Sequence, residues 1–174
     1  MDFFEVLKKR VSVRRFKEKP LGKGALEKIF SSIISAPSAG NLQSFKVIAV
    51  ECAEKKKELS CAAFRNGSLA IAEAPIVLVF LADPKNSAAQ YGERGETLYA
   101  LQDATIACSY AQLAAEALGL SSVWVGAFDE EKAGKTLGLK GASPRPIAIL
   151  PIGYANEQPE RRSRKKTNDL ISSL

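Results

Sequence analysis

Two arginines and a serine alternate along a short stretch near the N-terminus. The stretch RVSVRRF covers residues 10–16, with Arg10, Ser12 and Arg14 at every second position. In an extended segment alternate side chains share one side, so two guanidinium groups and a hydroxyl would form a donor set suited to a phosphate. The opposite side would carry the intervening residues, Val11, Val13 and Arg15. A strand edge protected by arginines explains the pattern equally well.

Two further segments could bring their backbone close to a ligand. In APSAGNLQSF (36–45), small residues permit close approach, and the amides of Asn41 and Gln43 can both donate and accept hydrogen bonds. In WVGAFDEEK (124–132), an expected strand ends at Gly126 just before an expected helix. Free N–H groups at such a turn can bind an anion or a ring heteroatom. An ordinary structural connection accounts for either segment equally well.

The chain contains no histidine. This excludes the commonest general base, Ser-His and Cys-His nucleophile pairs, and histidine-containing zinc sites. Chemistry would therefore depend on carboxylates, lysines or a bound cofactor, and we assign no catalytic side chain and no metal ligand. Neither GxGxxG nor GxxxxGK[ST] occurs, so Rossmann and P-loop nucleotide sites lack their motifs.

The net charge is +6, from 25 lysines and arginines against 19 acidic residues. This excess favours an anionic partner, which could be a nucleic acid or a small phosphorylated ligand. The densest basic run is RRSRKK (161–166), for which a solvated chain end is the ordinary explanation. It has no interleaved aromatic residues, and the chain shows no RRM, KH or zinc-finger pattern. We therefore expect no nucleic-acid partner.

Length and composition are typical of one globular domain. The 174 residues are 46% hydrophobic and 25% charged, which argues against disorder. No apolar run reaches the roughly 18 residues of a membrane span, and the N-terminus does not resemble a signal peptide. We expect a cytoplasmic protein without a membrane partner. The three cysteines form no CxxC pair, so a disulfide framework is not expected.

Periodicity and breaker residues predict the elements that position these segments. Helices are expected over 2–10, 24–36, 53–64, 97–120 and 129–139, and strands over 44–51, 74–83, 121–128 and 145–155. The run 74–83 suits a strand buried on both faces, and 97–120 is apolar nearly all round and should be buried. Residues 84–96 are expected to form a polar loop. The pattern predicts an α+β or α/β domain whose helices cover a small sheet.

Six segments, taken in order, resemble the nitroreductase family of FMN-dependent oxidoreductases. They run from Arg10 to Glu157 and read RVSVRRF, APSAGNLQSFKVIAV, EAPIVLVFLAD, YGERG with LQDATIA, LAAEALGLSSVWVGAFDEEK and RPIAILPIGYANE. The resemblance implies an α+β three-layer fold, in which helices flank a small, mostly antiparallel sheet within a single domain, 1–174. It also implies a homodimer whose C-terminal tail, 160–174, packs on the partner subunit.

The same resemblance implies which residues hold FMN. In one chain, the phosphate and ribityl chain would be held by Arg10, Val11, Ser12 and Arg14. The other subunit would contribute Pro37, Ser38, Ala39, Asn41 and Gln43. The turn near flavin N5 would comprise Val125, Gly126 and Ala127. The basic tail would reach the phosphate through Arg164 and Lys165, and the substrate pocket would be lined by Tyr91 and Arg94.

Some positions depart from the common family pattern. Ser44 and Phe45 stand where many members have proline and tryptophan, and Ala127 replaces a frequent glycine. The resemblance implies a ping-pong reaction in which FMN passes electrons from NADH or NADPH to an electron-poor acceptor such as a nitroaromatic or a quinone, and this requires no histidine. The alternatives are a reductive dehalogenase or another specialised reductase on the same fold, and a basic nucleic-acid-binding module.

Overall fold

The structure is a computed structural model that describes residues 1–64, 66–141 and 143–173. The α-helices are α1 (Phe3–Lys9), α2 (Ala25–Ile34), α3 (Ala53–Ser60), α4 (Asn66–Glu73), α5 (Pro84–Arg94), α6 (Ala100–Ala117) and α7 (Glu130–Thr136). Shorter helical turns are η1 (Ala39–Asn41), η2 (Gly95–Tyr99) and η3 (Thr167–Asp169). The strands are β1 (Phe45–Val50), β2 (Ile76–Ala82), β3 (Ser121–Ser122) and β4 (Arg145–Gly153).

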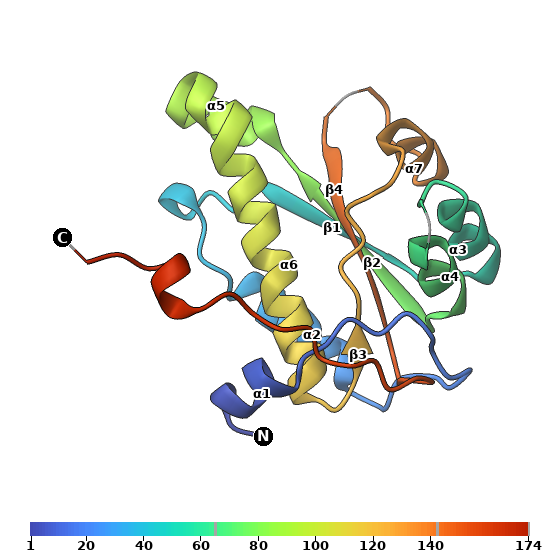
Figure 1. The fold of residues 1–174 in the computed structure, drawn as a ribbon. Coiled ribbons are helices and arrows are strands. Elements are labelled where there is room, and N and C mark those ends of the chain that lie inside the picture. Colours follow the sequence, from blue (N-terminus) through green and yellow to red (C-terminus); the bar gives the residue numbers. More distant parts are fainter. Residues whose placement is uncertain (65, 142, 174) are drawn as a thin grey trace.

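The strands form one antiparallel sheet in the order β1-β2-β4-β3 (Figure 1). Every residue of β2 is buried because the strand has a neighbour on each side and helices on each face. One face packs against α2 and α6 through Ile76, Leu78 and Phe80. The other packs against α3, α4 and α7 through Val77, Val79 and Leu81. The three-layer α+β fold is thus confirmed, as is a strand buried on both faces within 74–83.

Helix α6 is the longest of the described helices and packs across one face of the sheet (Figure 1). Its buried side is built from small residues, including Ala107, Cys108, Ala111 and Ala115, none of which has exposed surface. Small side chains let a helix lie close to the strands beneath it. The predicted helix over 97–120 therefore exists, but it begins at Ala100 because residues 95–99 form the π-helical turn η2. Within the described ranges, no helix has both the length and the apolar character to cross a membrane.

The interpretation of residues 84–96 as a loop was wrong, because the structure forms α5 there. Pro84 lies in the first turn of this helix, where its fixed φ is compatible with helix and its missing N–H costs nothing. The two glycines that indicated a loop have other roles. Gly92 interrupts the helix at φ +57°, and Gly95 packs so closely that a Cβ there would lie 2.3 Å from the Ser87 carbonyl oxygen.

Two other predicted elements are shorter in the structure. The helix expected over 53–64 ends at Ser60, and the separate helix α4 follows it. The strand expected over 121–128 pairs with β4 only through β3 and an isolated bridge between Val125 and Ile149, while Phe128 forms a bridge with Ala63 instead. The register of these pairs would place Val123 opposite Pro151 of β4. Because proline has no N–H to donate, the ladder is interrupted there.

Candidate functional site

The alternating segment 10–14 runs beside β3 in the sheet. Ser12 forms a bridge with Ser122, and the Val13 N–H donates to the Ser122 carbonyl at 3.1 Å. Val13 is only 2% exposed and belongs to the core, so its neighbours in the alternation turn outward. Arg15 lies away from them and pairs with Glu73 at 3.0 Å. The alternation therefore holds for Val13 and Arg15, whereas Val11 packs partly against the core and also lies on the side of Arg10 and Ser12.

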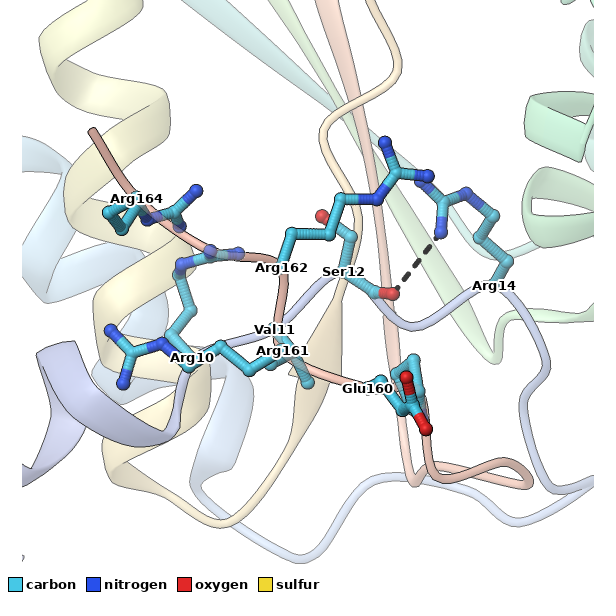
Figure 2. A pocket seen from close by; sticks show the side chains of 9 residues that line it. Arg10, Val11, Ser12, Arg14, Glu160, Arg161, Arg162 and Arg164 are labelled. Carbon is cyan, nitrogen blue, oxygen red and sulfur yellow. Dashed lines mark hydrogen bonds between the residues drawn. The ribbon is translucent and has the colours of Figure 1, made fainter.

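The C-terminal tail closes over this segment and forms a cavity of about 410 Å³ (Figure 2). The N-terminal segment lines it with Arg10, Val11, Ser12 and Arg14. The tail lines it with Pro159, Glu160, Arg161, Arg162 and Arg164. The two segments are tied together because the Glu157 carboxylate accepts the N–H groups of Arg14 and Arg15, and Arg161 donates to the Lys8 carbonyl. We call this cavity, with its lining residues, the arginine cradle.

The arginine cradle carries a large excess of positive charge. Five guanidinium groups line it together with one carboxylate, that of Glu160. Among residues 1–64, 66–141 and 143–173, none of the five forms an ion pair. Burial and then repulsion from Arg164 lower the pKa of Arg10, while attraction to Glu116 opposes the shift. Figure 2 shows Arg10 beside Arg164. An anion in the cavity would relieve this repulsion.

A second group of predicted residues lies in the loop 37–44, which contains η1. Pro37, Asn41 and Gln43 are exposed, whereas Ser38 and Ala39 are half-buried. The loop is held by its own hydrogen bonds, including one from the Gln43 N–H to Ser38 Oγ at 2.9 Å. It also depends on a carboxylate of α6, Asp103. Asp103 was not predicted from the sequence, although an acid among the small apolar residues of this helix was an available signal.

Helix α5 packs against the same loop. Asn86 Nδ2 donates to the Leu42 carbonyl at 3.0 Å. The Tyr91 hydroxyl lies so near Gly40 that a Cβ there would be 2.3 Å from it. Arg94 Nε donates to the Tyr99 hydroxyl at 3.0 Å, and the rings of Tyr91 and Tyr99 meet edge to face at 5.2 Å. The structure therefore places Tyr91 directly against the loop and Arg94 one aromatic ring further away.

The turn 125–127 lies on the connection between β3 and α7. Val125 exchanges backbone hydrogen bonds with Ile149 at 2.9 and 3.0 Å, and the Ala127 carbonyl accepts the Phe64 N–H at 3.0 Å. These bonds fasten both ends of the turn, while Gly126 and Ala127 remain exposed at the surface. Since Ser122 pairs with Ser12, the turn follows directly from the strand that borders the arginine cradle.

Within one chain, the loop and the cradle lie toward opposite ends of α6. The loop is bonded to Asp103, and Arg10 is attracted by Glu116. These acids are thirteen residues apart, which corresponds to about 20 Å along a helix. The structure therefore brings segment 10–14 and the tail together, with the turn 125–127 following from the adjacent strand, but it does not bring the loop to them.

The tail lines the cradle with three arginines, of which the resemblance implied only one. Arg164 lines the cradle, but Lys165 is not among the lining residues. The cradle is also lined by Arg161 and Arg162, which were expected only as part of a solvated basic run. The available signal was the density of the basic run itself, RRSRKK.

Comparisons with known proteins agree on one family. The chain matches the model of the nitroreductase family over residues 7–68 and 63–154. It is 32% identical to an NADH dehydrogenase of Thermus thermophilus, over 86% of this chain and 85% of that protein. It is 31% identical to an FMN reductase (NAD(P)H) of Bacillus subtilis, over 89% and 65%. The crystal structure of a nitroreductase family protein from Streptococcus pneumoniae superposes with a TM-score of 0.90 at 22% identity, covering 99% of this chain and all of that one.

Proposed function

Because the chain belongs to the nitroreductase family, we propose that it is an FMN-dependent oxidoreductase that uses NADH or NADPH as electron donor. The observation that carries the proposal is the arginine cradle. Its five guanidinium groups provide planar, charged donors for a phosphate monoester, and the Ser12 hydroxyl adds a neutral donor. The phosphate would also supply negative charge to the five arginines, none of which forms an ion pair within the described residues.

The residues of this chain would bind and orient the cofactor. Arg10, Ser12 and Arg164 would hold the FMN phosphate, and Arg14 would lie toward the ribityl chain. The exposed turn at Gly126 would present backbone N–H groups to a ring heteroatom. When bound, FMN would supply the redox chemistry for a ping-pong transfer of electrons from NADH or NADPH to an electron-poor acceptor such as a nitroaromatic or a quinone.

We propose further that two copies of the chain complete each site. The loop 37–44 cannot meet the cradle of its own chain if both keep their places along α6, so it would face the cradle of a partner. Helices α1 and α2 expose large apolar side chains, namely Phe3, Phe4, Leu7, Phe30 and Ile34. A groove of about 470 Å³ lies between α1 and α6. Exposed apolar patches of this kind are typical of subunit interfaces.

The tail supports the same arrangement. Its residues 161–170 are all exposed, and it extends past α6 away from the sheet (Figure 1). Leu170 and Ile171, near its end, are 67% and 69% exposed. Apolar residues on an extended segment gain burial by packing on another surface. In the proposed dimer, residues 160–174 therefore pack on the partner subunit.

The acceptor would bind beside the loop 37–44. Tyr91 and Tyr99 offer aromatic rings there, and Arg94 adds a cation. A small, planar, electron-poor molecule matches this set because such rings are attracted to aromatic side chains and their polar substituents to a guanidinium.

Reconstitution and anaerobic reduction test the proposal. The purified protein should bind FMN, and NADH or NADPH should bleach the flavin absorbance under anaerobic conditions. Adding a nitroaromatic or a quinone should restore it. A protein that cannot be reconstituted with FMN would contradict the proposed function. Sedimentation should give a dimer, and a monomer that retains FMN would contradict the shared site.

A further inference from the structure

Asp103 is a carboxylate with almost no access to solvent. It is 1% exposed and lies in the first turn of α6. Its Oδ1 accepts the N–H of Ala39 at 2.9 Å, and its Oδ2 accepts the N–H of Ser44 at 3.2 Å. Burial of a charge is unfavourable unless hydrogen bonds compensate for lost water. Each oxygen of Asp103 has such a partner, and both partners belong to the loop 37–44.

The backbone between these two hydrogen bonds is strained. Asn41 and Gln43 have φ values of +55° and +50°, in the left-handed region that residues with a side chain rarely occupy. Such conformations persist only where surrounding contacts hold them. The carboxylate fastens the loop on both sides of the strained residues. The side chains of Asn41 and Gln43 remain exposed between the two fastened points.

We propose that Asp103 is a positioning residue for the flavin site. Its carboxylate holds the loop 37–44 in the conformation in which Ser38, Asn41 and Gln43 meet FMN, so the loop is pre-organised before the cofactor arrives. This inference rests on the proposed function. A carboxylate is required because both partners are N–H donors. An asparagine would accept from one of them and direct its own amide N–H at the other.

The test compares Asp103→Asn with Cys108→Ala. Cys108 is buried five residues further along α6 and packs within the apolar cluster on that face of the sheet, so its truncation weakens the helix packing without touching the loop. Asp103→Ala is measured in parallel, because it brings no opposing donor and favours helix, so the comparison does not depend on one variant folding.

Two measurements are made on the dimer, one without FMN and one with it. Without FMN, hydrogen exchange of the peptide covering 38–45 should be faster in the Asp103 variants than in Cys108→Ala. With FMN, the Asp103 variants should bind about tenfold more weakly and show an altered visible spectrum of the bound flavin. Cys108→Ala should lower the thermal midpoint and leave FMN affinity and spectrum unchanged.

The outcomes separate the two levels of the proposal. If the wild-type protein does not bind FMN, the proposed function fails, and the exchange experiment still reports whether Asp103 holds the loop. If the wild type binds FMN and the Asp103 variants bind it equally well with the same spectrum, Asp103 is only structural and the inference is overturned. Equal exchange rates in the Asp103 and Cys108 variants would overturn it as well.

Discussion

The arginine cradle and the loop 37–44 are built on opposite principles. The cradle gathers cationic side chains from the two ends of the chain, and its lining residues include one carboxylate against five guanidinium groups. The loop has no charged side chain of its own, and a buried carboxylate holds its strained backbone in place. In the proposed flavin site, the cradle would attract the FMN phosphate electrostatically, and the loop would orient the cofactor. Substitutions in the cradle should therefore act on FMN affinity alone, whereas substitutions that loosen the loop should also change its conformation.

The largest effect is expected from removing Arg10 from the cradle. Arg10→Ala should weaken FMN binding roughly 10- to 100-fold, because a hydrogen bond to a charged group is lost. Arg15→Ala is the matched control, since Arg15 points away from the cradle and pairs with Glu73. Titration of flavin fluorescence measures both affinities. Equal losses in the two variants would contradict the separation of the two sides of this segment.

A substitution in the loop 37–44 should change the stability of the fold. Gly40→Ala should lower the free energy of unfolding by about 1–2 kcal/mol, because alanine is strained at φ +55° and its Cβ would meet the Tyr91 hydroxyl. Gly119→Ala is the control, since that position has φ +73° but open space around it. Urea denaturation of both variants isolates the contribution of the Tyr91 contact. If Gly119→Ala lowers the free energy of unfolding by the same amount, the contact between Tyr91 and Gly40 does not contribute to stability.

A smaller effect should distinguish neighbouring residues of the tail. Arg164→Ala should weaken FMN binding about threefold to tenfold, since an exposed cation contributes modestly. Lys165→Ala should change little, because Lys165 does not line the cradle. Titrations at low and high salt should bring the two variants together at high salt, where exposed charges are screened. A larger loss in Lys165→Ala would reverse the assignment within the tail.

The smallest effect concerns Glu116, behind the cradle. Burial raises the pKa of Glu116, and attraction to Arg10 and Lys9 only partly offsets this. The folded state therefore favours the protonated acid, so its contribution to stability is full below the ordinary value of 4.5 and is lost as the pH rises through the raised value. Thermal unfolding between pH 4 and 7 should show this loss in the wild type, below about 1 kcal/mol, and less of it in Glu116→Gln. An identical pH dependence in both proteins would exclude Glu116 as its source.

Local patterns predicted the parts of the fold that depend on local periodicity. The alternation around Val13 and the apolar run of β2 were both readable, because burial of alternate or consecutive residues leaves a direct mark on the sequence. Helix α5 was missed because its two glycines have packing and kink roles that only the folded chain reveals. The shortening of β3 depends on Pro151, which lies on a different strand.

The residues of the candidate site were predictable from the sequence only in part. The arginines of the cradle were visible as two basic runs, but which tail residues face the cavity depends on how the tail crosses segment 10–14. Asp103 was missed because its partners, Ala39 and Ser44, are about sixty residues away along the chain. An acid among the apolar residues of a helix indicates a role without indicating its partner.

The spacing of about 20 Å along α6 has a consequence for inheritance. In the proposed dimer, each site takes its cradle from one chain and its loop from the other. A chain altered at Arg10 and a chain altered at Asp103 would each form pairs in which both sites bind FMN weakly. When the two are produced together, a mixed pair combines both defects in one site and leaves its other site intact. Two alleles that each weaken FMN binding should therefore complement each other.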